Sequence, residues 1–376
     1  MTEAASQRNT RHARIAVIGG GAIGLACALE LAGRGARVCV YDRASAAAEG
    51  VSGRAAGMLG VSFEAGGSPV LYRLMQRSGA AWKEFAIRLE TAGGGGDIGY
   101  SALPSIFCAM TPTELVRLPS GAFLAPDQIR QIEPAITGQI HKGALLLQDR
   151  QVDPILLVER LASILAHAGS EVRVGEPVDG IECGPTFRTP DGGEWDQVLV
   201  ATGAGQPPMF VRNGDAIDPR LPPIVPVKGQ MLALKPWPGA PRHVIRLAET
   251  YIVPKARWIL VGATEEPGRR DETVEPDVIT KLRAKAAEVV GGIATAEQAA
   301  VWAGVRPGTQ DGLPMIGETA IPGVFAATGH YRNGILLAPE TAKIIADAML
   351  DAKVTAADRA FSPLRFDKPV TAPHSR

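Results

Sequence analysis

The sequence contains little cysteine, no excess of charge of either sign and no long uninterrupted hydrophobic run. Cys27, Cys39, Cys108 and Cys183 are spread along 376 residues, and none of them forms a CxxC pair. This spacing argues against a zinc site or a disulfide framework and favours small buried thiols in a reducing compartment. Lys plus Arg and Asp plus Glu both number 39. The balance excludes the basic footprint of a nucleic-acid-binding protein and a charged membrane anchor.

The start of the chain resembles a signal peptide but does not fit one. Three arginines precede the apolar stretch 15–29, and this stretch is too short to span a membrane. Four glycines between positions 19 and 24 also interrupt it. We therefore expect a cytoplasmic protein, with flexible termini at 1–13 and 367–376.

A glycine-rich turn indicates a dinucleotide-binding site. The apolar run 15–18 predicts a buried parallel strand, and the next six residues, Gly19 to Gly24, match GxGxxG before a helical pattern. In such a turn Gly19 allows the tight bend, Gly21 lets the backbone approach a pyrophosphate, and Gly24 lets the helix pack closely. Asp42 ends the second predicted strand, where a carboxylate binds the adenosine ribose and disfavours NADP. The turn alone does not distinguish NAD from FAD.

The rest of the chain departs from the regular strand–helix repeat of an NAD dehydrogenase. Residues 49–64 are small and glycine-rich, as expected for backbone lying against a flat ligand. Buried strands are predicted at 198–201 and 323–329, and alternating strands at 229–235 and 250–262. The pattern predicts an α/β protein whose nucleotide-binding sheet comes from three separate pieces of chain, with an inserted antiparallel-sheet domain.

Several motifs resemble the D-amino-acid oxidase superfamily of flavoproteins, and more narrowly the glycine oxidases of thiamin biosynthesis. Those motifs include residues 55–59 (AAGML), 227–230 (VKGQ), 302–309 (WAGVRPGT) and 329–339 (GHYRNGILLAP). The resemblance runs from about residue 14 to residue 366. It implies a Rossmann-like FAD-binding domain and a substrate-binding domain with an antiparallel sheet. We expect the FAD-binding domain at 14–90, 144–226 and 301–366, and the substrate-binding domain at 91–143 and 227–300.

The resemblance implies bound FAD, oxygen as electron acceptor and a small, glycine-like amino acid as substrate. Oxidative deamination moves a hydride from the substrate Cα to flavin N5 and yields a 2-oxo acid, ammonia and hydrogen peroxide. The substrate carboxylate must be held in place, and arginine does this best through a bidentate pair. By the family pattern, Arg306 holds that carboxylate, Arg332 helps to close the pocket, and the Tyr251 hydroxyl binds the same group. No general base and no metal site are assigned.

We expect non-covalent FAD, because no His lies near Arg54 and Ala55 and no Cys follows Arg306. The predicted cofactor contacts are Gly19, Gly21, Ala22, Ile23, Gly24, Asp42, Arg43, Val51, Ser52, Ala56, Gly57, Met58, Val178, Gly203, His330, Tyr331, Arg332, Asn333, Gly334, Ile335 and Leu336.

Two positions depart from the family pattern. Glu265 stands where an apolar residue is usual, and Phe63 stands where a small residue is common. Both departures argue against glycine as the preferred substrate. The alternative is therefore a D-amino-acid, sarcosine or other secondary-amine oxidase or dehydrogenase. An inactive flavin-binding subunit is disfavoured, because Arg306, Arg332 and Tyr251 are all present. We expect a homo-oligomer and a thiazole-forming enzyme as partners, but no nucleic acid and no membrane.

Overall fold

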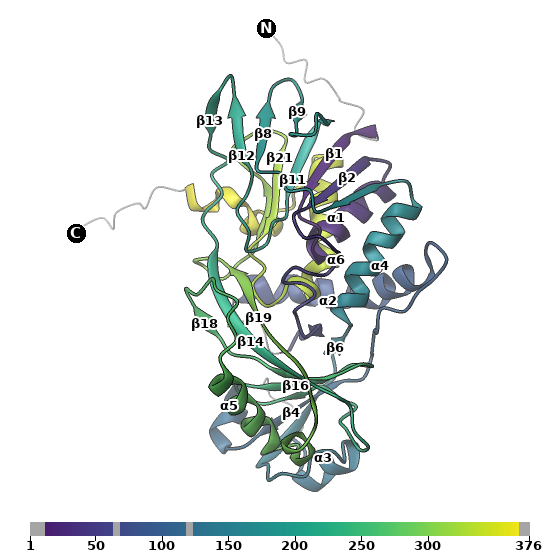
Figure 1. Ribbon diagram of the computed structural model, residues 1–376, viewed down its shortest axis with the longest axis vertical. Helices are drawn as coiled ribbons and strands as arrows, with labels where there is room; N and C mark the ends of the chain where they lie inside the picture. Colours follow the sequence, from purple (N-terminus) through teal and green to yellow (C-terminus); the bar gives the residue numbers. More distant parts are fainter. Residues whose placement is uncertain (1–11, 63–67, 118–122, 368–376) are drawn as a thin grey trace, which may run out of the picture.

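The computed structural model describes residues 12–62, 68–117 and 123–367, which form an elongated molecule with a large sheet toward each end (Figure 1). The upper end in Figure 1 contains the chain's first strand and its last, although they lie about 300 residues apart in the sequence. The lower end is built from the middle of the chain.

A six-stranded sheet forms the upper part. Its order is β20-β21-β11-β1-β2-β7, and all pairs are parallel except β20 with β21. The strands are β1 (Arg14–Ile18), β2 (Arg37–Asp42), β7 (Glu171–Val174), β11 (Gln197–Val200), β20 (Met315–Glu318) and β21 (Val324–Thr328). The prediction of one sheet from three separated pieces of chain is confirmed, and so is the α/β fold class.

Three helices pack on this sheet: α1 (Ala22–Gly33), α4 (Pro154–His167) and α6 (Gly334–Asp351). Helix α2 (Pro69–Thr91) packs against α6 and α4. Pro339 lies inside α6 and cannot donate a backbone hydrogen bond. Helix α2 contacts α6 one turn before this proline, because Ser78 Oγ and Trp82 Nε1 both donate to the carbonyl of Leu336, at 2.7 and 2.8 Å. This contact fixes the first turn of α6, directly after the segment that forms part of the candidate site.

An eight-stranded, mainly antiparallel sheet forms the lower part. It runs β18-β14-β17-β16-β15-β4-β5, and β19 pairs with β14 along nearly its whole length. The strands are β4 (Ser105–Ala109), β5 (Lys142–Leu146), β14 (Val225–Leu234), β15 (Ile245–Arg246), β16 (Tyr251–Pro254), β17 (Ile259–Gly262), β18 (Glu266–Pro267) and β19 (Gln298–Gly308). Helices α3 (Pro126–Ile132) and α5 (Pro276–Ala287) pack on it. Strand β19 crosses the domain boundary predicted at residue 301, and the full set of boundaries stays a prediction.

Two small sheets complete the fold. One has the order β10-β9-β8-β12-β13, and the other pairs β3 with β6. Their strands are β3 (Met58–Leu59), β6 (Arg150–Gln151), β8 (Gly180–Cys183), β9 (Phe187–Arg188), β10 (Glu194–Trp195), β12 (Met209–Arg212) and β13 (Asp215–Ile217).

All four cysteines are unpaired and buried, as predicted. Within the described ranges, no helix combines the length and the apolar character needed to cross a membrane.

Candidate functional site

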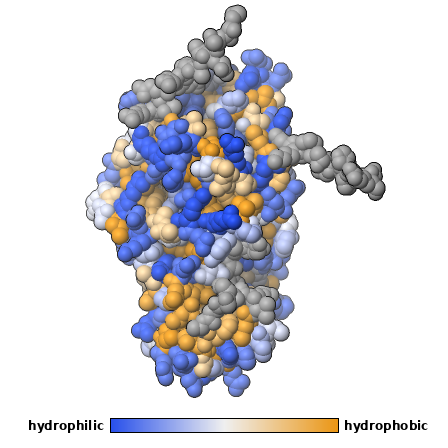
Figure 2. Space-filling model, turned by 180° about the vertical axis from the view of Figure 1, so that it is seen from behind, coloured by the Kyte–Doolittle hydropathy of each residue, from blue (hydrophilic) through white to orange (hydrophobic). Residues whose placement is uncertain are grey.

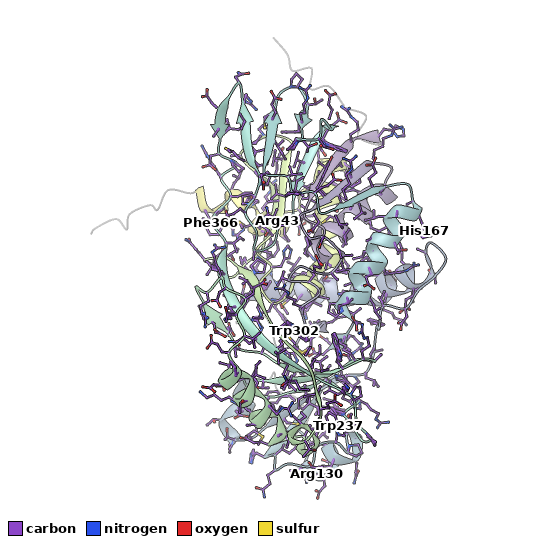
Figure 3. The ribbon with its side chains drawn as sticks, in the orientation of Figure 1. Arg43, Arg130, His167, Trp237, Trp302 and Phe366 are labelled. Atoms are coloured by element: carbon purple, nitrogen blue, oxygen red, sulfur yellow. The ribbon has the colours of Figure 1, made fainter. Side chains whose placement is uncertain are left out.

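A cavity of about 460 Å³ lies where the two large sheets meet. Its upper wall comes from loops at the carboxyl ends of β1, β2, β11 and β21, and its lower wall comes from β14, β16 and β19. Arg43, which follows β2, and Trp302, in β19, are labelled in the upper and the lower half of the molecule in Figure 3. Ligands of open α/β sheets bind at the carboxyl ends of the strands, so the cavity lies where the fold predicts a nucleotide.

The glycine-rich turn forms one end of this cavity. Gly19 has φ +118°, and a Cβ there would clash with the carbonyl of Ala201, so only glycine fits. Helix α1 begins at Ala22 without a side-chain cap from Gly21. Ser52 Oγ accepts one N–H of this turn, that of Ala22, at 3.1 Å. The remaining N–H groups and the helix dipole make this end suited to a phosphate group.

Asp42 lies beside the same turn. Its carboxylate accepts the N–H of Gly20 at 2.5 Å and the N–H of Ala44 at 2.7 Å. These two bonds fix the carboxylate at the cavity wall, which Asp42 and Arg43 both line. A carboxylate held in this way, next to a phosphate-binding turn, fits a ribose hydroxyl pair.

All but four of the predicted cofactor residues line the cavity. Ala22 takes part in the turn through its N–H. A Cβ at Gly24 would clash with the carbonyl of Gly19, so this glycine lets α1 pack closely. Val178 and Leu336 lie in hydrophobic clusters.

The cavity also has lining residues that the sequence argument did not assign to it. They are Ala44, Gly50, Arg54, Ala55, Ala201, Thr202, Ala204, Gly205, Gly229, Met231, Arg270, Glu272, Gly304, Val305, Pro307, Ala327 and Thr328. The sequence carries a usable signal at Gly229, because a lone glycine inside a strand pattern marks a close approach.

Arg306, Arg332 and Tyr251 line this one cavity together, although three different segments supply them. Arg306 lies on β19 and donates from Nη1 to the carbonyls of Thr264, at 3.1 Å, and Lys228, at 3.4 Å. Among the residues that the structure describes, no carboxylate pairs with Arg306. Its guanidinium is therefore positioned by neutral acceptors and keeps its charge available for an anion.

Two glycines make room for these side chains. A Cβ at Gly229, on the neighbouring strand β14, would lie 2.6 Å from Cζ of Arg306. Gly262 pairs with Tyr251 across β16 and β17, and a Cβ there would lie 2.9 Å from the tyrosine hydroxyl. Arg306 and Tyr251 can therefore lie flat against the sheet only because both neighbours lack a side chain.

His330 also lines the cavity but is buried, with Nε2 3.0 Å from Thr341 Oγ1. Burial lowers the pKa of His330 to about 3. The imidazole is therefore neutral at physiological pH, and it is a poor proton acceptor.

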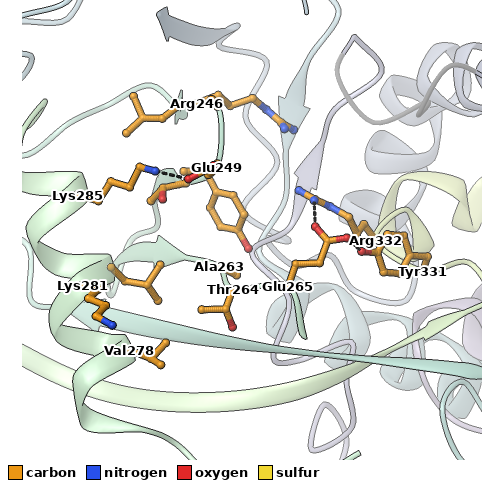
Figure 4. A pocket seen from close by; sticks show the side chains of 15 residues that line it. Arg246, Glu249, Ala263, Thr264, Glu265, Val278, Lys281, Lys285, Tyr331 and Arg332 are labelled. Atoms are coloured by element: carbon orange, nitrogen blue, oxygen red, sulfur yellow. Dashed lines mark hydrogen bonds and ion pairs between the residues drawn. The ribbon is translucent and has the colours of Figure 1, made fainter. Parts of the chain in front are cut away.

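A second cavity of about 710 Å³ lies between α5 and the ends of β16 and β17 (Figure 4). Tyr251, Tyr331 and Arg332 line both cavities. Glu265 faces this second cavity, where its Oε2 is 3.2 Å from Arg332 Nη1 and its Oε1 accepts the hydroxyl of Tyr331. The unusual carboxylate at position 265 thus meets a cation. Phe63, the other departure, lies outside the described residues.

The chain is similar to several known proteins along most of its length. Residues 14–348 match the family described as FAD dependent oxidoreductase. The chain is 34% identical to a glycine oxidase of Geobacillus kaustophilus, across 92% of this chain and 95% of that protein. A crystal structure of a glycine oxidase from the same organism superimposes with a TM-score of 0.81 at 32% identity, covering 94% of this chain and 99% of that one. The chain is also 32% identical to a bifunctional protein ThiO/ThiG of Synechocystis, covering 94% of this chain but 54% of that protein.

Proposed function

Because the chain belongs to the family of FAD-dependent oxidoreductases, we propose that it oxidises a small amino acid such as glycine at the carbon that bears the amine. The observation that carries this proposal is Arg306, an arginine without a carboxylate partner among the described residues, in the same cavity as the phosphate-binding turn. Such a pairing brings a substrate carboxylate and a dinucleotide into one chamber.

The residues of the upper wall fit FAD. The Gly19–Gly21 turn and the start of α1 would bind the pyrophosphate, and Asp42 would bind the adenosine ribose. FAD bound here supplies the two-electron acceptor that oxidation of an amine requires. We propose non-covalent binding, since none of the four cysteines lines this cavity, and the histidine that does line it, His330, is buried with its Nε2 3.0 Å from Thr341 Oγ1.

The lower wall would bind and orient the substrate. The Arg306 guanidinium takes the carboxylate in a bidentate pair, and the Tyr251 hydroxyl donates a further hydrogen bond to it. Arg332 closes the same chamber toward the second cavity. We assign no general base, because His330 is a poor proton acceptor at neutral pH and an amine bound in its neutral form needs none.

The overall reaction balances with oxygen and water. The amino acid loses two electrons and two protons to oxygen, which becomes hydrogen peroxide, and water hydrolyses the resulting imine to a 2-oxo acid and ammonia. The alternative substrate is a D-amino acid, sarcosine or another secondary amine. Glu265 is the observation that keeps this alternative open, because it adds a carboxylate next to the chamber.

We also propose that a separate thiazole-forming enzyme uses the product in the cytoplasm. The bifunctional relatives support a partner, because this chain spans about half of their length.

We propose a homo-oligomer as well. Figure 2 shows hydrophobic residues gathered on the lower end of the molecule, which is one candidate for a contact surface.

The test is oxidation of glycine, sarcosine, D-alanine and D-proline by the purified yellow protein in air. We expect glycine to give equal amounts of hydrogen peroxide and 2-oxo acid. Oxidation of a substrate without peroxide would contradict the oxidase assignment, and turnover of D-proline or sarcosine alone would favour the alternative.

A further inference from the structure

Glu265 joins the two walls of the candidate site. It follows β17 in the lower sheet, whereas its partners Tyr331 and Arg332 belong to the turn between β21 and α6 in the upper part. The side chains of Arg332 and Glu265 are 31% and 50% exposed, so solvent reaches the pair from the second cavity. Figure 4 shows the Glu265 carboxylate directed toward Arg332, with a dashed line between them.

The backbone beside Glu265 is fixed. The carbonyl of Thr264 accepts a bond from Arg306, and Thr264 Oγ1 accepts the N–H of Gln230 at 2.9 Å. Thr264 Oγ1 also donates to Oε1 of Glu266 at 2.6 Å. The segment that carries Glu265 is thus tied through Thr264 to Arg306, the arginine proposed to bind the substrate carboxylate.

The two arginines of the chamber therefore differ in the net charge that they offer to a ligand. Arg306 has only backbone carbonyls as partners among the described groups, whereas Glu265 already neutralises Arg332. A second anionic group on a substrate would have to displace the Glu265 carboxylate from Arg332. That displacement gives Arg332 to the substrate and leaves the Glu265 carboxylate without this cation, close to a second carboxylate, which is unfavourable.

We infer that Glu265 is a specificity-determining residue that occupies Arg332 and thereby limits the site to substrates with one carboxylate. Amino acids and N-substituted glycines with a second carboxylate are excluded, while neutral small amino acids bind through Arg306. This inference rests on the proposed function for its substrate class, but the occupation of Arg332 by Glu265 rests on the hydrogen bonds alone.

The first experiment measures binding rather than turnover. Acetate and malonate differ by one carboxylate, and each is titrated into the FAD-loaded protein while the flavin absorbance is followed. Glu265→Gln keeps the shape of the side chain and removes its charge. In this variant we expect the Kd of malonate to fall about tenfold relative to the Kd of acetate. Combining this change with Arg332→Gln should abolish the gain.

Glu249→Gln is the matched control. Glu249 lines the same second cavity and pairs with Lys285 on α5 rather than with Arg332 (Figure 4). The substitution Glu249→Gln removes one negative charge from the same cavity as Glu265→Gln, so a general electrostatic effect would appear in both variants. We expect a shift of less than about threefold in this control. An unchanged ratio in Glu265→Gln, or an equal shift in Glu249→Gln, would overturn the inference.

The second experiment uses substrates that differ in the same way. The ratio of kcat/KM for N-carboxymethylglycine to that for N-methylglycine should rise about tenfold in Glu265→Gln, mainly through KM. If malonate binding shifts as expected while no amino acid reduces the flavin, the proposed function fails and the role of Glu265 stands. If amino acids are oxidised but neither ratio moves, the role of Glu265 fails alone.

Discussion

Arg306 has a guanidinium that touches only neutral acceptors in the described structure, at the point where the substrate carboxylate is proposed to bind. Replacement by alanine removes the charge and both donors of a bidentate pair. We expect kcat/KM to fall by ~10²-fold or more, since such a partner contributes roughly 2–5 kcal/mol and each ~1.4 kcal/mol is tenfold. Steady-state kinetics with the preferred amino acid measure this effect.

Arg270→Ala is the control for Arg306→Ala. Arg270 lines the same cavity, but it is exposed and donates to the carbonyl of Ile224. Both variants should keep their FAD. Full activity of Arg306→Ala would remove this residue from the substrate site, and loss of FAD would make it a cofactor ligand instead.

Asp42 is expected to act on FAD retention and also on the stability of the glycine-rich turn. Its carboxylate accepts two backbone N–H groups, at 2.5 and 2.7 Å. Asp42→Ala should weaken FAD binding about tenfold or more and lower the Tm of the FAD-free protein, because both donors lose their acceptor at roughly 1–3 kcal/mol each. Fluorescence of released FAD and thermal unfolding measure the two effects.

Asp179→Ala should show neither effect. Asp179 is a carboxylate near the same edge, 82% exposed and 3.4 Å from Arg43. FAD retention that is equal in Asp42→Ala and in the native protein would disprove the ribose role of Asp42.

At single residues the sequence predicts the position of some side chains better than that of others. Gly19 and Asp42 were recognisable because their spacing is local, within one strand–turn–helix–strand unit. The partner of Glu265 was not, since Arg332 lies 67 positions away and on the other wall. Sequence reasoning found the carboxylate unusual, but only the folded chain shows that a cation neutralises it.

At the scale of elements, the β14–β19 pair builds the lower wall. These strands place Gly229 diagonally opposite Arg306, so the absent side chain of one strand accommodates the long side chain of the other. Gly229→Ala should therefore displace the guanidinium and lower kcat/KM by about tenfold to 10²-fold, mostly through KM. FAD content should be unchanged.

A second strand glycine provides the comparison for Gly229→Ala. At Gly180, in β8, the nearest atom to a Cβ would be the carbonyl O of Met209 at 3.8 Å, an ordinary contact. Gly180→Ala should keep native kinetics. Native kinetics in Gly229→Ala as well would show that the space beside Arg306 is not needed.

Elements whose hydrophobic pattern is local were predictable, and elements defined by distant pairing were not. The strands β1, β2, β11 and β21 carry continuous apolar runs, which is why their sheet could be expected. The pairing of β15 with β4 joins segments about 140 residues apart and consists of two short strands. No periodicity in either strand indicates its partner, because pairing depends on the whole fold.

At the scale of the whole molecule, His330 couples stability to pH. Its pKa is lowered to about 3 by burial, whereas an unfolded histidine titrates near pH 6.5. Between these values the unfolded chain binds more protons, so the free energy of unfolding falls as pH falls below about 6.5, by up to ~1.4 kcal/mol per pH unit. The FAD-loaded variant His330→Gln should lose less stability between pH 6.5 and pH 5 than the native protein.

His167→Gln serves as the reference for this pH series. His167 ends α4 on the surface, where it is exposed. Its denaturation midpoints should follow the native curve. Parallel curves for His330→Gln and the native protein would mean that His330 binds its proton equally well in both states.

The central claim is that one cavity brings a small amino acid, held by Arg306, against FAD. Anaerobic mixing of the FAD-loaded protein with glycine, followed by stopped-flow absorbance, tests this claim most directly. The account predicts that the native protein loses its yellow colour, at a rate that saturates as the glycine concentration rises. It also predicts that Arg306→Ala needs at least tenfold more glycine, and that admitted air restores the colour with formation of hydrogen peroxide. A flavin that stays oxidised with glycine and with every other small amino acid tested would contradict the account.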